Sequence, residues 1–175
     1  PNELLKSALN YYENGFSVIP VYQGTKKPAV RWKPYQQKRP NIEQVKEWFS
    51  KGDKGIAVIT GAVSGNLTCR DFDKISEYDK WSIKNKGLAE TLPTVKTFKG
   101  NHVYFLSRFS KIKHIDNGEL RGEGGYCLLP PSIHPKGRKY KWIINISKDI
   151  PEIDPNVFLS RYTRDTETQD TQETQ

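Results

Sequence analysis

The sequence predicts an α+β fold built on a mostly antiparallel or mixed sheet. Two observations support this class: the predicted strands outnumber the predicted helices, and several neighbouring strands are joined by short turns typical of hairpins. The length of 175 residues fits one domain, or one compact domain with a tail. Hydrophobic residues make up 35% and aromatic residues 11% of the chain, so we expect a core that depends on large aromatic side chains.

The first third of the chain predicts two helices, each followed by a strand. Apolar residues at helical spacing predict a helix over 2–14, which Gly15 ends. The run FSVIPVY over 16–22 predicts a strand at a sheet edge, because it contains a proline. A second helix over 41–51 begins with an Asn and a Gln spaced for a capping box, and GIAVIT over 55–60 predicts a strong strand.

The rest of the chain predicts one helix and further strands. Turn residues over 61–66 lead us to expect that a strand over 67–73 pairs back on its predecessor. A helix over 75–86 follows, with Ile75, Tyr78, Trp81 and Ser82 expected on its inner face. The later strands are expected, in order, over 93–98, 102–107, 119–121, 126–129 and 140–144. A turn over 99–101 is expected to join the first two as a hairpin, and the glycine-rich corner over 122–125 to continue the sheet into 126–129.

The charge is unevenly distributed along the chain. The net charge is +8, but residues 165–175 contain four acidic and no basic residues, so the other 164 positions hold 28 basic against 16 acidic residues, a net +12. Such a domain is expected to bind a polyanion, nucleic acid first, although a merely basic surface is the alternative. From 162 onward, Thr, Gln, Asp and Glu repeat without apolar periodicity, which predicts a catalytic domain over 1–161 and a disordered acidic linker over 162–175.

The two cysteines, Cys69 and Cys127, are too few for a disulfide framework. With no CxxC and only three histidines, their spacing is not that of a structural zinc site, so we expect small buried hydrophobes in a reducing, intracellular setting. No apolar run approaches the ~18 residues of a membrane span. The chain starts at Pro1 and contains no Met, so we expect it to be a piece of a longer protein.

An aspartate pair is the first candidate for chemistry. Asp71 and Asp73 alternate along a predicted strand and therefore point to one face, whereas Arg70 and Phe72 point to the other. Two carboxylates near a strand end suit Mg²⁺ or Mn²⁺, which prefer oxygen ligands. The alternative is a pair of solvated aspartates in a turn, but Asp is poorly suited to strands.

Three more segments carry candidate residues. His102 follows a small-residue turn and could hydrogen-bond a phosphate, or could be structural. Glu119 and Arg121 share a strand face, where they could complete a metal site and bind a triphosphate, or form only an ion pair. The loop over 130–140 combines Ser132, His134 and three cations, which suits phosphates but equally a basic hairpin loop.

The motifs also follow a recognisable order. Along the chain they are a strand ending in P-x-Y, a KKP loop, a WF helix, IAVITG, SGN, DFD, T-x-x-G-x-H-x-Y-F, RGEGGY and P-P-S-I-H-P-x-G-x-x-Y-x-W. This order resembles the bifunctional primase–polymerase domain of the archaeo-eukaryotic primase superfamily, found in plasmid and phage replication proteins and often followed by a helicase. The resemblance covers residues 3–145.

The resemblance implies a two-lobed fold whose catalytic half is an RRM-like sheet, and template-directed synthesis of primers and DNA from NTPs or dNTPs with Mg²⁺ or Mn²⁺. It implies a two-metal mechanism in which Asp71, Asp73 and Glu119 hold the ions and His102 contacts the incoming phosphates. It further implies single-stranded DNA template and primer as partners, a helicase domain after this piece, no membrane, and a cytoplasmic location in a prokaryotic host cell. The implied nucleotide-binding residues, besides His102, are Arg121, Ser132, His134, Ser64 and Gly65.

The chain departs from the family pattern in three respects. Arg70 stands where the family usually has an apolar residue, so we expect the outer side of that strand to be more open than usual. Glu119 is often Asp in relatives, and the zinc-binding stem of some plasmid relatives is absent.

Three other functions are alternatives. A non-catalytic RRM-like module that binds single strands would explain the charge and the aromatics, but not three acids that repel the backbone. A rolling-circle nickase would need an HxH motif, which this chain lacks. A glycosyltransferase with a DxD motif would explain Asp71 and Asp73, but not the basic charge or the other motifs.

Overall fold

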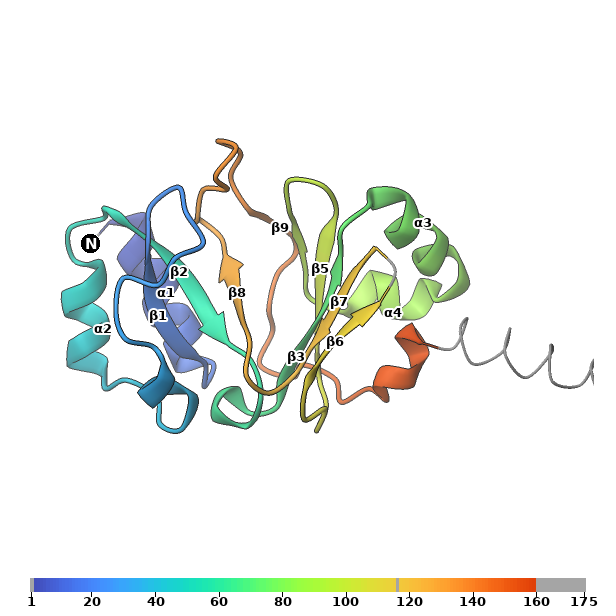
Figure 1. Cartoon of the computed structure of the whole chain (residues 1–175), viewed down its shortest axis with the longest axis horizontal. Coiled ribbons are helices and arrows are strands. Elements are labelled where there is room, and N and C mark those ends of the chain that lie inside the picture. Colours follow the sequence, from blue (N-terminus) through green and yellow to red (C-terminus); the bar gives the residue numbers. More distant parts are fainter. Residues whose placement is uncertain (1, 116, 160–175) are drawn as a thin grey trace, which may run out of the picture.

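The computed structural model describes residues 2–115 and 117–159, and the predicted linker lies outside them. The fold is α+β, with two sheets in which all pairings between the named strands are antiparallel. Figure 1 shows helices α1 and α2 with the three-stranded sheet at one end, and α3 and α4 beyond the six-stranded sheet at the other. The candidate site described below lies where the two sheets face each other.

The three-stranded sheet has the order β1-β2-β8. Strand β1 (Ser17–Tyr22) is an edge strand that pairs with β2 (Lys54–Ile59), as expected from its proline, and β2 pairs with β8 (Tyr126–Leu129). Helices α1 (Glu3–Glu13) and α2 (Ile42–Phe49) pack on this sheet through a shared apolar core. The predicted capping box of α2 is present, with the Asn41 side chain accepting a hydrogen bond from the Gln44 backbone and the Gln44 side chain accepting one from the Asn41 backbone.

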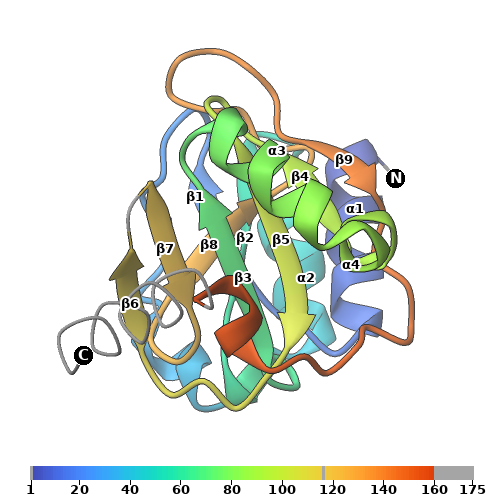
Figure 2. The ribbon, with the colours of Figure 1, turned by 90° about the vertical axis from the view of Figure 1, so that its right-hand side faces the viewer.

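The six-stranded sheet has the order β6-β7-β3-β5-β4-β9. Its central strand β3 (Leu67–Phe72) lies between β7 (Gly118–Arg121) and β5 (Asn101–Leu106), and the flanking strands are β6 (Ile112–Ile115), β4 (Thr94–Lys96) and β9 (Lys141–Ile144). Helices α3 (Ile75–Lys84) and α4 (Lys86–Thr91) lie across its outer face, as Figure 2 shows. Burial of Trp81, Leu92, Val103 and Phe105 in one cluster explains this placement.

Two predicted connections were wrong. The strand over 67–73 does not pair back on β2; the turn over 61–66, which contains the short 3-10 helix Ala62–Ser64, passes the chain to the other sheet. The glycine corner over 122–125 returns it, because β7 and β8 belong to different sheets. Turn residues mark where a strand ends, but which strand the chain then joins is decided by packing between distant segments.

Smaller differences concern single elements. The sequence analysis did not predict α4 or β6, and Ile75, expected on the inner face of α3, is 48% exposed. Two further 3-10 helices span Lys33–Gln36 and Pro155–Phe158, and the second packs Phe158 against Trp81 and Phe105. Within the described residues, no helix is long and apolar enough to cross a membrane.

One apolar core joins the two sheets. It contains residues of α1, α2 and the three-stranded sheet together with Leu67, Cys69, Val95 and Tyr104 from the inner face of the six-stranded sheet. Tyr11 of α1 also accepts a hydrogen bond from the Trp142 indole of β9 at 3.0 Å. The side chains that face this interior near its open end line the candidate site.

Candidate active site in a pocket between the sheets

Three of the predicted site residues lie side by side on adjacent strands. In the antiparallel register, Asp71 of β3 is directly opposite His102 of β5 on one side and Glu119 of β7 on the other. Directly paired residues point to the same face of a sheet, so these side chains form one row across three strands. The alternation expected along β3 and β7 is what produces this row.

The approach of β7 to β3 depends on a glycine. Gly118 has a φ of +144°, and a Cβ added there would collide with the backbone oxygen of Asp71. A side chain at this position would push β7 away from β3. Gly118 therefore allows Glu119 to lie next to Asp71.

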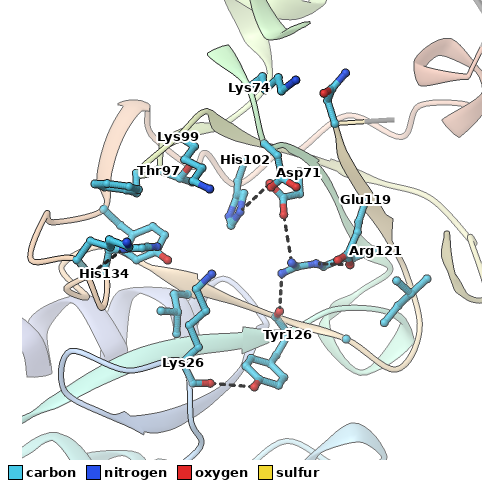
Figure 3. A pocket seen from close by; sticks show the side chains of 18 of the residues that line it. Lys26, Asp71, Lys74, Thr97, Lys99, His102, Glu119, Arg121, Tyr126 and His134 are labelled. Atoms are coloured by element: carbon cyan, nitrogen blue, oxygen red, sulfur yellow. Dashed lines mark hydrogen bonds and ion pairs between the residues drawn. The ribbon is translucent and has the colours of Figure 1, made fainter. Parts of the chain in front are cut away.

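Arg121 connects the two acids of this row. Its Nη2 lies 3.1 Å from Asp71 Oδ2 and its Nε lies 3.1 Å from Glu119 Oε2, while its Nη1 donates to the Tyr126 backbone oxygen at 3.0 Å. His102 Nε2 lies 3.4 Å from the other oxygen of Asp71, Oδ1 (Figure 3). A fixed guanidinium thus lies between two carboxylates and reduces their mutual repulsion.

Asp73 joins the same pocket from beyond the end of β3. The pocket measures about 750 Å³, within the range of small-molecule sites. Asp71, Asp73, His102, Glu119 and Arg121 all contribute to its wall, with four lysines around them. These lysines are Lys26, Lys74, Lys99 and Lys136.

The acids have different protonation properties. Burial alone would raise the pKa of Asp71, but His102, Arg121 and Arg70 outweigh it and hold that pKa at about 2. Partial burial and the facing charges of Asp71 and Glu119 raise the pKa of Asp73 instead. Three carboxylates therefore converge at one place, and a cation among them would relieve their repulsion.

His134 lies at the rim of the pocket and not in this row. Its ring stacks on Phe98 with centroids 4.8 Å apart, and the Arg138 guanidinium lies over the Phe98 ring, 5.4 Å from its centroid. Desolvation and the nearby lysines lower the pKa of His134. His134, which the sequence predicted to bind nucleotide, thus lines the pocket with its ring stacked on a neighbouring aromatic ring (Figure 3).

A comparison with family models decides the family. The model of the bifunctional DNA primase/polymerase N-terminal domain matches residues 8–156. The chain belongs to this family. Membership implies a nucleotidyltransferase-type enzyme with DNA and nucleotides as substrates, and primase/polymerase enzymes are generally metal-dependent. No curated protein gives a significant match to the chain.

The primase/polymerase pocket fits a hard divalent cation. Asp71, Asp73 and Glu119 supply carboxylate oxygens, which are the ligands that Mg²⁺ and Mn²⁺ prefer. The raised pKa of Asp73 reflects burial and like charges facing it, as expected for a carboxylate cluster that a cation would complete. Arg121 holds two of these acids in the free protein, so it must share them with any bound cation.

The structure does not bring Ser132, Ser64 and Gly65 into the pocket. The Ser132 hydroxyl accepts a hydrogen bond from the Ile56 backbone N–H at 2.8 Å and donates to the Ile56 oxygen at 2.9 Å. The Ser64 hydroxyl likewise accepts from Ser17 N–H and donates to the Ile59 oxygen. Gly65 is an exposed residue with a φ of +70° that ends the short helix before β3.

Arg70 lies on the opposite face of β3, and that face is not open as expected. The residue is 5% exposed; its guanidinium lies 4.0 Å from the centre of the Phe72 ring and donates to the backbone oxygen of Asp71. Burial lowers the pKa of Arg70 to about 10. The long side chain fills the space that an apolar residue would occupy.

Both cysteines are buried in the apolar core, as expected, but polar groups also lie next to them. Burial raises the pKa of Cys69, whereas a hydrogen bond with Cys69 and the nearby Arg121 guanidinium lower the pKa of Cys127. Arg121 Nη1 lies 3.6 Å from the Cys127 sulfur. The two thiols therefore lie next to the row of acids, on the inner side of the six-stranded sheet.

Sequence reasoning missed several aromatic pocket residues. Trp32 and Tyr126 meet edge to face with centroids 4.9 Å apart, and the Tyr126 hydroxyl donates to the Lys26 backbone oxygen at 2.8 Å. Tyr140 lines the opposite wall, where burial and nearby Asp71 raise its pKa to about 12. These aromatic residues were missed because they come from segments that are far apart in the sequence. The one local signal was the glycine-rich corner before Tyr126.

Proposed function

We propose that this chain carries out template-directed nucleotidyl transfer as a DNA primase and DNA polymerase, in the replication of a plasmid or phage in a prokaryotic cell. The observation that carries the proposal is the row formed by His102, Asp71 and Glu119, with Asp73 beside it, in one pocket of a domain that is otherwise basic. Acids concentrated at one place among lysines suit a reaction between a polyanionic template and a triphosphate.

The acids have the role of metal ligands in this proposal. Asp71, Asp73 and Glu119 would hold Mg²⁺ or Mn²⁺, which supplies activation of the primer 3′-hydroxyl and neutralisation of the triphosphate. Asp71 is suited to this role because its low pKa keeps it ionised at neutral pH. Asp73 lies next to Asp71, and no guanidinium holds it at hydrogen-bond distance in the described structure, so it would turn toward a cation.

His102 and Arg121 would orient the phosphates. Arg121 carries a planar set of donors that already binds carboxylate oxygens and can bind phosphate oxygens in the same way. His102 is fixed by Asp71, so its ring is preorganised at the pocket wall. His134, stacked on Phe98, would contact the nucleotide at the rim, whereas Ser132, Ser64 and Gly65 would support the backbone.

The proposal includes the two-lobed fold with an RRM-like catalytic sheet. The order β7-β3-β5-β4, with helices between β3 and β4, supports it, and each sheet carries helices of its own. Single-stranded DNA and a primer would follow the basic surface, and a helicase domain is proposed beyond this piece of the protein.

Primer extension tests the proposal. With a primed DNA template, dNTPs and Mg²⁺ or Mn²⁺, we expect Asp71→Asn and Asp73→Ala each to reduce incorporation by about 10² or more, because each removes a charge that stabilises the transition state. Asp79→Asn is the matched control, since this exposed aspartate lies on α3 outside the pocket. Thermal unfolding should remain cooperative in all three variants.

Two results would contradict the proposal. Extension at the wild-type rate by Asp71→Asn or Asp73→Ala would show that these acids are not the metal ligands. Tight binding of single-stranded DNA by the wild-type chain without incorporation under any metal would favour a binding module.

A further inference from the structure

A second cluster of potential metal ligands lies next to the carboxylates, deeper between the two sheets. Cys69 of β3, His102 of β5 and Cys127 of β8 each offer one ligand atom, and these atoms all lie within 4.8 Å of one another. All three residues are buried, at 0%, 6% and 1% exposure respectively. The spacing along the chain does not reveal the cluster, because its members come from both sheets.

The sheet register explains why these residues meet. Cys69 is two residues before Asp71 on the same face of β3, opposite Arg121 on one side and Tyr104 on the other. Cys127 pairs with Val58 in the three-stranded sheet and reaches across from β8. A ligand held by the cluster would therefore join the two sheets directly under the pocket.

An unpartnered nitrogen is the second observation that points to a ligand. His102 Nδ1 is buried and has no hydrogen-bond partner among the described residues, while Nε2 faces Asp71. A carboxylate beside Nε2 favours the proton on that nitrogen, which leaves the lone pair of Nδ1 available to a metal. The Tyr104 hydroxyl, on the same face of β5, is also buried without a partner among these residues.

The donor set selects a thiophilic ion. Two sulfurs and one imidazole suit Zn²⁺, whereas Mg²⁺ and Mn²⁺ prefer the carboxylates above. We propose that Cys69, Cys127 and His102 form a zinc site, separate from the carboxylate site, that ties β3 and β5 to β8. Binding would release one proton from each thiol, and the two thiolates would then balance the charge of the ion. The fourth position would be left to water or to a group from the pocket.

Zinc at Nδ1 leaves His102 only Nε2, which faces Asp71, so in this site His102 positions Asp71 and does not contact a phosphate. The test measures metal binding directly and does not depend on activity. Co²⁺ replaces Zn²⁺ and reports thiolate ligands by a charge-transfer band in the near ultraviolet. Added to the reduced, metal-free chain, it should give this band and the visible bands of tetrahedral cobalt, saturating near one equivalent. Zn²⁺ should displace it, excess Mg²⁺ should not, and Zn²⁺ should raise the melting temperature by preferential binding to the folded state.

Variants make the assignment specific. The chain has only two cysteines, so a thiolate band can come from no other residues. Cys69→Ala and Cys127→Ala should each abolish the band and the zinc-dependent rise in melting temperature. Asp73→Asn, which changes the carboxylate site alone, should keep both. The proposal would be overturned if the wild-type chain gave no band, or if the band survived in either alanine variant. It would also be overturned if the two thiols formed a disulfide and bound no metal.

Discussion

At the scale of single residues, the buried Arg70 of β3 and the half-buried Arg121 of β7 have opposite energetic roles. Arg121 bridges two carboxylates on the inner face. Arg70 lies on the outer face, where its contacts among the described residues are backbone oxygens and the Phe72 ring, and its Nε has no partner in that part of the chain. Removing one partner of a buried ion pair is strongly destabilising, but replacing an unpaired buried charge by an apolar side chain is often neutral or stabilising.

Methionine substitutions test this contrast. We expect Arg121→Met to lower the free energy of unfolding by about 3 kcal/mol, because it leaves Asp71 and Glu119 facing each other without a cation. Arg70→Met should change the same free energy by less than about 1 kcal/mol, or raise it. Urea denaturation of both variants measures the difference.

The same experiment with a divalent cation adds a control. Millimolar Mn²⁺ should restore part of the stability of Arg121→Met and have little effect on Arg70→Met, because the carboxylates lie on the Arg121 side of the sheet. Equal losses in the two variants, with or without Mn²⁺, would contradict these roles.

At the scale of elements, hydroxyl groups predicted to bind nucleotide hold strands together. Ser132, in the loop after β8, bonds both the N–H and the carbonyl oxygen of Ile56 on β2. Ser64 has the same relation to Ser17 of β1 and Ile59 of β2. A serine in a loop rich in glycine and proline fits both roles, so the sequence could not distinguish them.

Ser132→Ala separates the two roles. It should lower the free energy of unfolding by about 1–3 kcal/mol, because the Ile56 N–H is left buried and unpaired. The KM for dNTP in primer extension should stay unchanged, since Ser132 does not line the pocket. Ser147→Ala, at an exposed position, is the control for stability. An increase in KM with unchanged stability would instead support a nucleotide contact.

Local signals predicted most elements but not their assembly. Capping residues, apolar periodicity and turns correctly placed α1, α2, β1 and the hairpin of β4 and β5. The crossings between the sheets were missed because pairing partners are set by long-range burial. The acids were predicted because alternation along one strand is local, whereas the Cys69, Cys127 and His102 cluster depends on the distance between two sheets.

At the scale of the whole molecule, charge and core packing place three acids together in one pocket of a basic body. The shared apolar core fixes the inner faces of both sheets, so the pocket walls keep their relative positions. Lysines from four separate segments surround the acids. This arrangement favours binding of a nucleic-acid backbone along the rim while the carboxylates remain available for cations.

The salt dependence of DNA binding tests this arrangement. Each phosphate contact adds about −0.7 to the slope of log K against log salt for single-stranded DNA, because bound counterions are released. Lys99 and Lys136 lie in different loops at the pocket, so the double variant Lys99→Gln/Lys136→Gln should reduce the slope by about 1.4 if each contacts one phosphate. Lys6→Gln, exposed on α1 behind the three-stranded sheet, should leave the slope unchanged. Fluorescence anisotropy of a labelled oligonucleotide over a range of salt concentrations measures all three slopes. An unchanged slope in the double variant, or an equal decrease in Lys6→Gln, would show that the DNA follows another face of the molecule.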